Sequence, residues 1–86
     1  MVLNMKRLYR VKLTPNKNNT YFIHDMNEMR EIPDHDLYSN FELDEVDVAI
    51  SENLVKRIVI YKYKRNPNML FIDEDDYTII FLNDFI

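Results

Sequence analysis

Four consecutive acidic residues, Asp73 to Asp76, are the densest group of potential metal ligands in the sequence. Calcium and magnesium prefer oxygen ligands, but loops that bind them alternate their ligands and use a glycine for the sharp turn. This sequence contains no glycine, and adjacent residues of a strand point to opposite faces. The uncharged, β-prone segment 77–83 follows, and charges beside such a segment suppress aggregation. We therefore predict a charged turn, with a loop-bound cation as the weaker alternative.

The histidines offer little further chemistry. Asp34, His35 and Asp36 could begin a metal site, but His24 is the only other histidine, and no HxxxH or HxxE spacing occurs. His24 could act as a general base, yet no serine lies in a nucleophile motif and cysteine is absent. The absence of glycine also excludes phosphate-binding loops. We predict no catalytic residue, no metal site, no cofactor and no enzymatic activity.

Basic and aromatic residues alternate in the segment YKYKR, residues 61–65. Sheet-type modules hold single-stranded nucleic acid by combining aromatic stacking with basic side chains. If Arg10 and Lys12 lay beside Lys62 and Lys64, the four would form a basic sheet face. Nucleic-acid binding through this face is the alternative hypothesis. The sequence pI of about 5.0 opposes it, because affinity for phosphates is mainly electrostatic.

The acidic segment 25–52 suggests a different kind of partner. Within it, Glu42, Asp44, Glu45 and Asp47 are the candidate residues for binding a basic groove on another protein. An exposed face balanced by the basic strands is the simpler interpretation.

The charges follow one another in four blocks. Residues 1–24, 25–52, 53–72 and 73–86 carry net charges of +5, −9, +5 and −5. Either basic and acidic elements become neighbours and neutralise each other, or the fold displays an acidic and a basic surface that steer a charged partner. The sequence leaves both interpretations open.

The first half of the chain predicts a β-hairpin, then an irregular segment. Residues 6–14 alternate apolar and polar side chains, PNKNN (15–19) predicts a turn, and residues 20–25 predict the returning strand. Residues 26–38 lack a clean period and contain Pro33, so we expect irregular structure with a short helical turn at 27–31.

Residues 39–57 predict the only long helix. Ser39 and Glu42 have capping-box spacing, and apolar residues recur at helical intervals from Leu43 to Leu54. The competing prediction is a strand at VDVAI (46–50), which alternates and is β-branched.

Strands are expected at 57–65, 69–73 and 77–86, the last apolar on both faces and therefore central. The predicted fold is a single α+β domain over residues 1–86. It is a small antiparallel sheet of about five strands with one helix packed on one face, in the order ββαβββ.

Composition limits the remaining functions. The N-terminal segment has no apolar stretch typical of a signal peptide, and no run approaches the ~20 apolar residues of a membrane helix, so a cytoplasmic protein is expected, in the host cytoplasm if viral. The bias towards Asn, Ile, Lys and Tyr is typical of AT-rich genomes, including those of many phages and viruses. We therefore expect a small non-enzymatic protein-binding module, such as a phage-, virus- or mobile-element-type regulator or inhibitor of a host protein. The partner is a host or cellular protein, with homodimerisation as a further expectation because sheet edges invite pairing.

Overall fold

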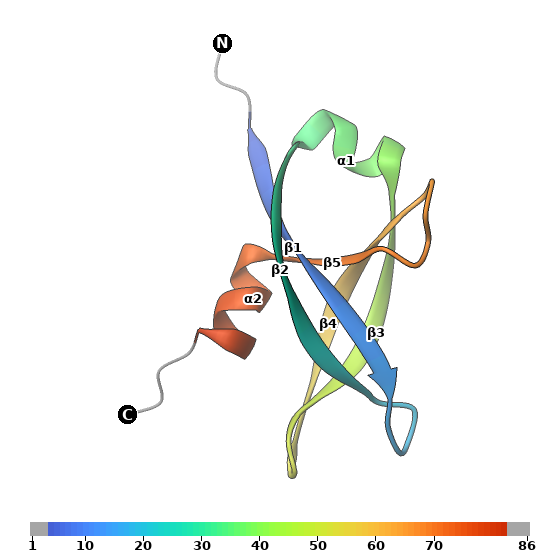
Figure 1. The fold of residues 1–86 in the computed structure, drawn as a ribbon, viewed down its shortest axis with the longest axis vertical. Coiled ribbons are helices and arrows are strands. Elements are labelled where there is room, and N and C mark those ends of the chain that lie inside the picture. The colour runs from blue at the N-terminus through green and yellow to red at the C-terminus, as the bar shows by residue number, and fades with distance from the viewer. Residues whose placement is uncertain (1–3, 83–86) are drawn as a thin grey trace.

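The computed structural model describes residues 4–82 and contains five strands and two helices. Along the chain these are β1 (Met5–Pro15), β2 (Tyr21–Pro33), α1 (Asp34–Asn40), β3 (Phe41–Ser51), β4 (Leu54–Tyr63), β5 (Leu70–Asp73) and α2 (Glu74–Phe81). Figure 1 shows two long hairpins, with α1 bridging them at one end and α2 lying against the outside. The α+β class and the five mostly antiparallel strands are confirmed, but there are two helices in the order ββαβββα.

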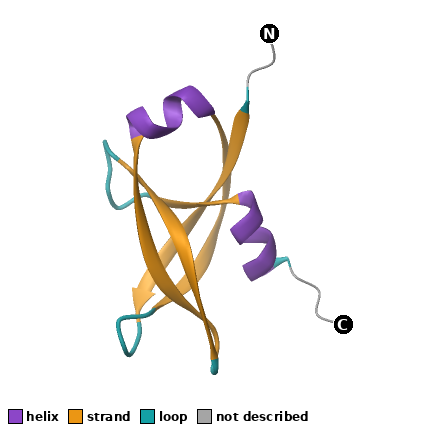
Figure 2. Cartoon of the chain, turned by 180° about the vertical axis from the view of Figure 1, so that it is seen from behind, coloured by secondary structure: helices purple, strands orange, loops and turns teal. Residues whose placement is uncertain are grey.

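The sheet curls into a barrel with the strand order β1-β2-β3-β4-β5. The hairpins β1–β2 and β3–β4 are antiparallel, and the short β5 joins them by pairing with both β1 and β4. The barrel closes on the other side through a single parallel pair, Tyr21 with Val48. Figures 1 and 2 show α1 crossing from β2 to β3 at the opposite end of these strands from the narrow closure.

The first hairpin follows the prediction at its turn. Asn18 and Asn19 adopt positive φ angles of 61° and 58°, a conformation that asparagine tolerates better than most residues. In a chain without glycine, asparagine supplies the left-handed positions of the PNKNN turn.

The expected irregular segment 26–38 is instead mostly strand, and a clean period is missing because the strand changes its buried face near a β-bulge. Tyr9 pairs with Met29 and Val11 with Asp25, so three residues of β2 lie opposite Arg10 alone. Asn27 sits in the bulge with a φ of 56°. The half-buried positions change from Tyr21, Ile23 and Asp25 before the bulge to Glu28 and Ile32 after its start, and no short helical turn forms at 27–31.

The predicted helix 39–57 is wrong. The helix of this region is α1, which ends at Asn40, and residues 41–51 form β3. Val46, Val48 and Ile50 recur with a period of two and pack in one core cluster, as the competing strand prediction at 46–50 required. The helical spacing from Leu43 to Leu54 was a coincidence, and the β-branched Val46 and Ile50 within it pack well in a pleated sheet.

The predicted strand 77–86 is also wrong over the described residues, because 74–81 form α2. The Asp73 side chain accepts a hydrogen bond from the Asp76 backbone N–H at 3.0 Å and caps the helix. The acidic run is therefore a helix start, where negative charge suits the helix dipole, rather than a turn between strands. Positions 83–86 of that predicted strand lie outside the described residues.

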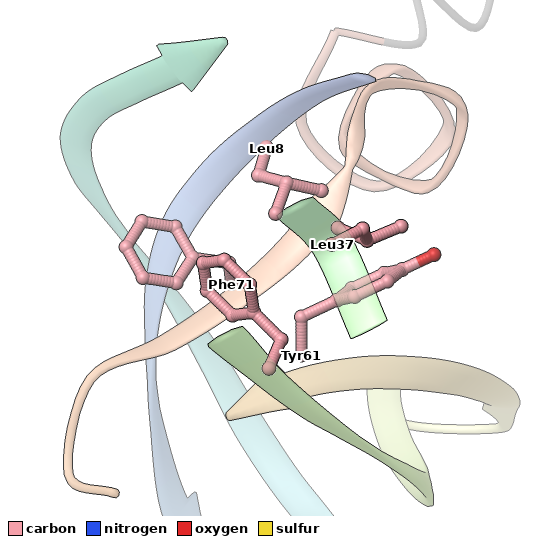
Figure 3. Close-up of a cluster of buried hydrophobic side chains, with 5 residues drawn as sticks. Leu8, Leu37, Tyr61 and Phe71 are labelled. Carbon is pink, nitrogen blue, oxygen red and sulfur yellow. The ribbon is translucent and has the colours of Figure 1, made fainter. Parts of the chain in front are cut away.

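Two core clusters use opposite faces of the sheet. The first comprises Leu8, Leu37, Phe41, Tyr61 and Phe71, and α1 contributes to it through Leu37 (Figure 3). The second comprises Val11, Val48, Ile58, Ile60 and Ile72, and α2 packs against it. Since Ile60 and Tyr61 are consecutive residues of β4, their side chains point to opposite faces. Each strand of this thin domain thus buries one face at one end and the other face further along.

Candidate protein-binding edge on β3

The four acidic candidate residues all lie on β3. Glu42, Asp44 and Glu45 are exposed and Asp47 is half-buried. By strand alternation Glu42 and Asp44 share one face, and Glu45 and Asp47 share the other. The structure therefore brings the four residues together along one strand but divides their side chains between its two faces.

Two of these acids are neutralised by β4. Asp44 Oδ2 lies 3.2 Å from Lys62 Nζ, and the Asp47 carboxylate accepts two hydrogen bonds from the Arg57 guanidinium at 2.9 and 3.2 Å. The hydrogen bonds from Arg57 lower the pKa of Asp47 below its ordinary value. Glu42 and Glu45 form no ion pair with any of residues 4–82, so they are the acids of β3 that remain for a partner.

The backbone of β3 has an unpaired outer edge. Its only pair with β2 is that of Val48 with Tyr21, so within residues 4–82 no strand covers positions 41–47 on that side. The Glu45 N–H donates to Asp44 Oδ1 at 2.9 Å instead of to a strand. Glu45 and its neighbour Val59 on β4 are therefore a non-hydrogen-bonded pair, and by alternation the peptide groups of Leu43, Glu45 and Asp47 face away from β4.

An apolar surface accompanies this edge. The Leu43 side chain is 39% exposed. Leu43 and Val59, together with Asp44 and Glu45, line an open depression of about 340 Å³. The edge thus combines free peptide groups, carboxylates and an apolar contact within a few residues.

The facing edge of β2 is less regular. The bulge at Asn27 interrupts it, and the Asn27 N–H is already bound by Asp25 Oδ1 at 2.8 Å. Bulges of this kind blunt a strand edge against pairing. β3 is consequently the better candidate of the two edges for contact with another chain.

The four basic candidate residues do not form a common face. β5 separates β1 from β4, and Arg10 shares a face with Tyr61, whereas Lys62 lies on the opposite face of β4. Arg10 is bound to Glu28 at 3.1 Å, and the Lys64 ammonium donates to the Tyr38 carbonyl at 3.1 Å. Lys12 is exposed.

Arg10 belongs to a small charged group that covers the core. Glu28 also accepts from Arg30 at 2.8 Å, and hydrogen bonds from Arg30 and Arg10 lower the pKa of Glu28. The Arg30 guanidinium lies 5.6 Å from the ring centroid of Phe71, which is fully buried. This arrangement gives Arg10 a structural role, because its charge is directed at Glu28.

The charge blocks are interleaved in space rather than segregated. Basic β1 contacts acidic β2 and α2, since Arg7 lies 3.3 Å from both Glu31 and Glu74. Basic β4 likewise contacts acidic β3. The neutralising interpretation therefore describes these strands, and Glu42 and Glu45 are the local exception.

The remaining candidate residues have local partners. The imidazole of His24 lies 3.0 Å from the Thr14 hydroxyl, and His35 lies 3.3 Å from Asp36 on the exposed side of α1. Among residues 4–82, no group of three His, Cys, Asp or Glu side chains could hold a metal ion. None of the helices in the same range is both long and apolar enough to cross a membrane.

Comparison with known proteins returned no match to a family model, to a curated protein or to a solved structure. The assignment of a binding site to β3 therefore rests on the geometry of the structure alone. The acids of the site are recognisable in the sequence, whereas Leu43 and the open edge are not, because both fall within the predicted helix 39–57. The alternation at 46–50 was the signal that could have revealed them.

Proposed function

We propose that the protein is a non-enzymatic protein-binding module whose partner presents a basic surface to β3. The observation that carries the proposal is the uncovered edge at residues 41–47, where Glu42 and Glu45 are exposed and free of ion pairs within the described part of the chain. Charges at such a site accelerate association with an oppositely charged partner and suppress wrong partners.

The small size, the absence of a recognisable catalytic constellation and the AT-rich type of composition support a regulator or inhibitor, encoded by a phage, a virus or another mobile element, that acts on a host protein. Such a protein needs one binding surface and no chemistry. Nucleic-acid binding has less support, because Arg10, Lys62 and Lys64 already have partners and do not share one face.

The test is capture of proteins from a lysate of the host organism by the immobilised full chain, with and without nuclease. Three proteins are compared: the wild type, the double variant Glu42→Gln/Glu45→Gln, and the control Glu52→Gln/Asp75→Asn. The control removes two exposed acids elsewhere, so both variants have the same net charge.

We expect a protein that the wild type and the control retain equally after nuclease treatment and that the β3 variant retains about tenfold less strongly. Identical capture by the two variants would contradict the assignment of the site. Capture that disappears with nuclease would favour the nucleic-acid alternative instead.

A further inference from the structure

We propose that the partner binds as an extended basic segment that adds a strand to the outer edge of β3. This inference rests on the proposed function and specifies its recognition mode. An exposed sheet edge offers a row of unpaired peptide groups, and pairing with them is a common way to bind a peptide.

The free peptide groups have the spacing that strand addition requires. Leu43, Glu45 and Asp47 are two residues apart, so their outward N–H and C=O groups repeat about every 7 Å along the strand. At Val48 the edge is closed by Tyr21, which limits the added segment to residues facing 41–47.

The other end of the edge is also held open. α1 has seven residues and connects the end of β2 to the start of β3. A helix rises ~1.5 Å per residue, so α1 keeps these ends roughly 10 Å apart, whereas paired strands lie ~4.8 Å apart. The edges of β2 and β3 therefore cannot pair beside α1.

The Asp44 carboxylate supplies a hydrogen-bond acceptor that a neighbouring strand would otherwise supply. Its Oδ1 accepts the hydrogen bond from the Glu45 N–H that a carbonyl of an added strand would otherwise accept. An incoming backbone exchanges this local bond for its own, and the Asp44 carboxylate keeps its ion pair with Lys62 through Oδ2.

Side chains on the two faces define the chemistry of the segment. On one face Glu42, which has no ion pair among residues 4–82, favours lysine or arginine, and on the other Leu43 and Val59 line the depression that an aliphatic side chain fits beside the Glu45 carboxylate. Because successive residues of a strand alternate between faces, the segment is expected to alternate basic and aliphatic residues. A second copy of β3 would place acids opposite acids, which opposes self-pairing at this edge.

The test uses the full chain and a synthetic peptide, acetylated and amidated, of the sequence Thr-Lys-Val-Lys-Val-Lys-Val-Lys-Thr. Two forms N-methylated either at all valines or at all lysines have the same charge, but each lacks the N–H donors of one backbone edge. Strand addition uses one edge of the peptide, so one methylated form should bind at least about tenfold more weakly and the other within about threefold of the unmodified peptide.

Two protein variants provide the matched comparison. Glu45→Gln removes a charge, whereas Glu45→Pro also removes the outward N–H, and proline is tolerated on strand edges. We expect Glu45→Pro to bind the unmodified peptide at least about tenfold more weakly than Glu45→Gln does. Circular dichroism spectra of the two variants confirm that each chain is folded. The peptide forms test the same edge with the wild-type protein if the proline variant does not fold.

Equal binding of both methylated peptides would overturn strand addition, as would the absence of any binding at about 1 mM peptide. A dimer of the free protein whose interface maps to β3 would overturn it as well. None of these outcomes affects the proposed function, which stands if lysate capture still depends on Glu42 and Glu45.

Discussion

At the scale of single residues, the structure assigns definite partners to side chains that looked interchangeable in the sequence. The acids of β3 illustrate this, because Asp44 and Asp47 form ion pairs with β4 whereas Glu42 and Glu45 form none among the described residues. Exposed ion pairs contribute little to stability, so the distribution of these charges matters more for recognition than for folding.

Tyr77 holds α2 against the sheet and provides a prediction at this scale. Its hydroxyl donates to Asp25 Oδ2 at 2.6 Å, and its ring stacks on Tyr9 with centroids 3.9 Å apart. The hydrogen bond to Asp25, with burial and the charge of Asp25, raises the pKa of Tyr77 above its ordinary value of 10.0. A raised pKa in the folded state means that the stabilisation is complete below pH 10.0 and is lost as the pH rises through the folded pKa.

We expect Tyr77→Phe to lower the Tm at neutral pH, and the difference from the wild type to shrink as the pH rises above 10.0 and through the folded pKa. Thermal unfolding followed by circular dichroism measures both quantities. Tyr38→Phe is the control, since the Tyr38 side chain is 69% exposed. A difference that does not change with pH would contradict the role of the hydrogen bond to Asp25.

At the scale of elements, the sequence indicated where caps and turns lie more reliably than it indicated whether the adjoining element is a helix or a strand. The acidic run was recognised as a local boundary, but it begins α2 instead of separating two strands. Its four carboxylates have a simple role there, since one caps the helix and three lie in its first turn.

This cap gives the prediction at the element scale. Asp73→Ala removes the side-chain acceptor of the Asp76 N–H and should lower the free energy of unfolding by about 1 kcal/mol. Urea unfolding measures the change. Asp75→Ala removes an exposed acid of the same helical turn, so its expected cost is only a few tenths of a kcal/mol. Equal losses in both variants would show that charge, not capping, explains the effect.

At the scale of the whole molecule, the strands of the barrel are paired over several residues on one side and through a single residue pair on the other. β4 pairs with β3 and β5, and β1 pairs with β2 and β5, whereas β2 and β3 share one pair of residues. The domain measures 45 × 32 × 19 Å, and its two clusters on opposite faces explain how so thin a molecule buries its apolar residues.

Native-state hydrogen exchange should report this asymmetry. We expect the slowest amides in β4, at Ile58, Ile60 and Tyr61, because this strand is paired on both sides and contributes to both clusters. The outward amides of Leu43 and Asp47 should exchange much faster. Comparable protection of Leu43 and Ile60 would mean that the β3 edge is covered in solution, and would also weaken the proposed binding mode.

The sequence by itself determined the features whose energies depend on nearby residues. The α+β class, the first hairpin with its asparagine turn, β4 and β5 follow from local alternation and turn chemistry. The composition also excluded glycine-rich phosphate loops, and the acids of the candidate site were recognised as a group.

Only the tertiary structure decided whether residues 41–51 and 74–81 form a strand or a helix, because their apolar residues fit both a helical and a strand period. Pairing with β4 selected the strand for 41–51, and packing of Tyr77, Ile80 and Phe81 on the second cluster accompanies the helix at 74–81. Pairing of β3 with β4 likewise decided which of its acids meet cations, and the narrow closure between β2 and β3 decided which peptide groups stay unpaired among the described residues. These outcomes depend on contacts between residues far apart in the chain, which local patterns do not encode.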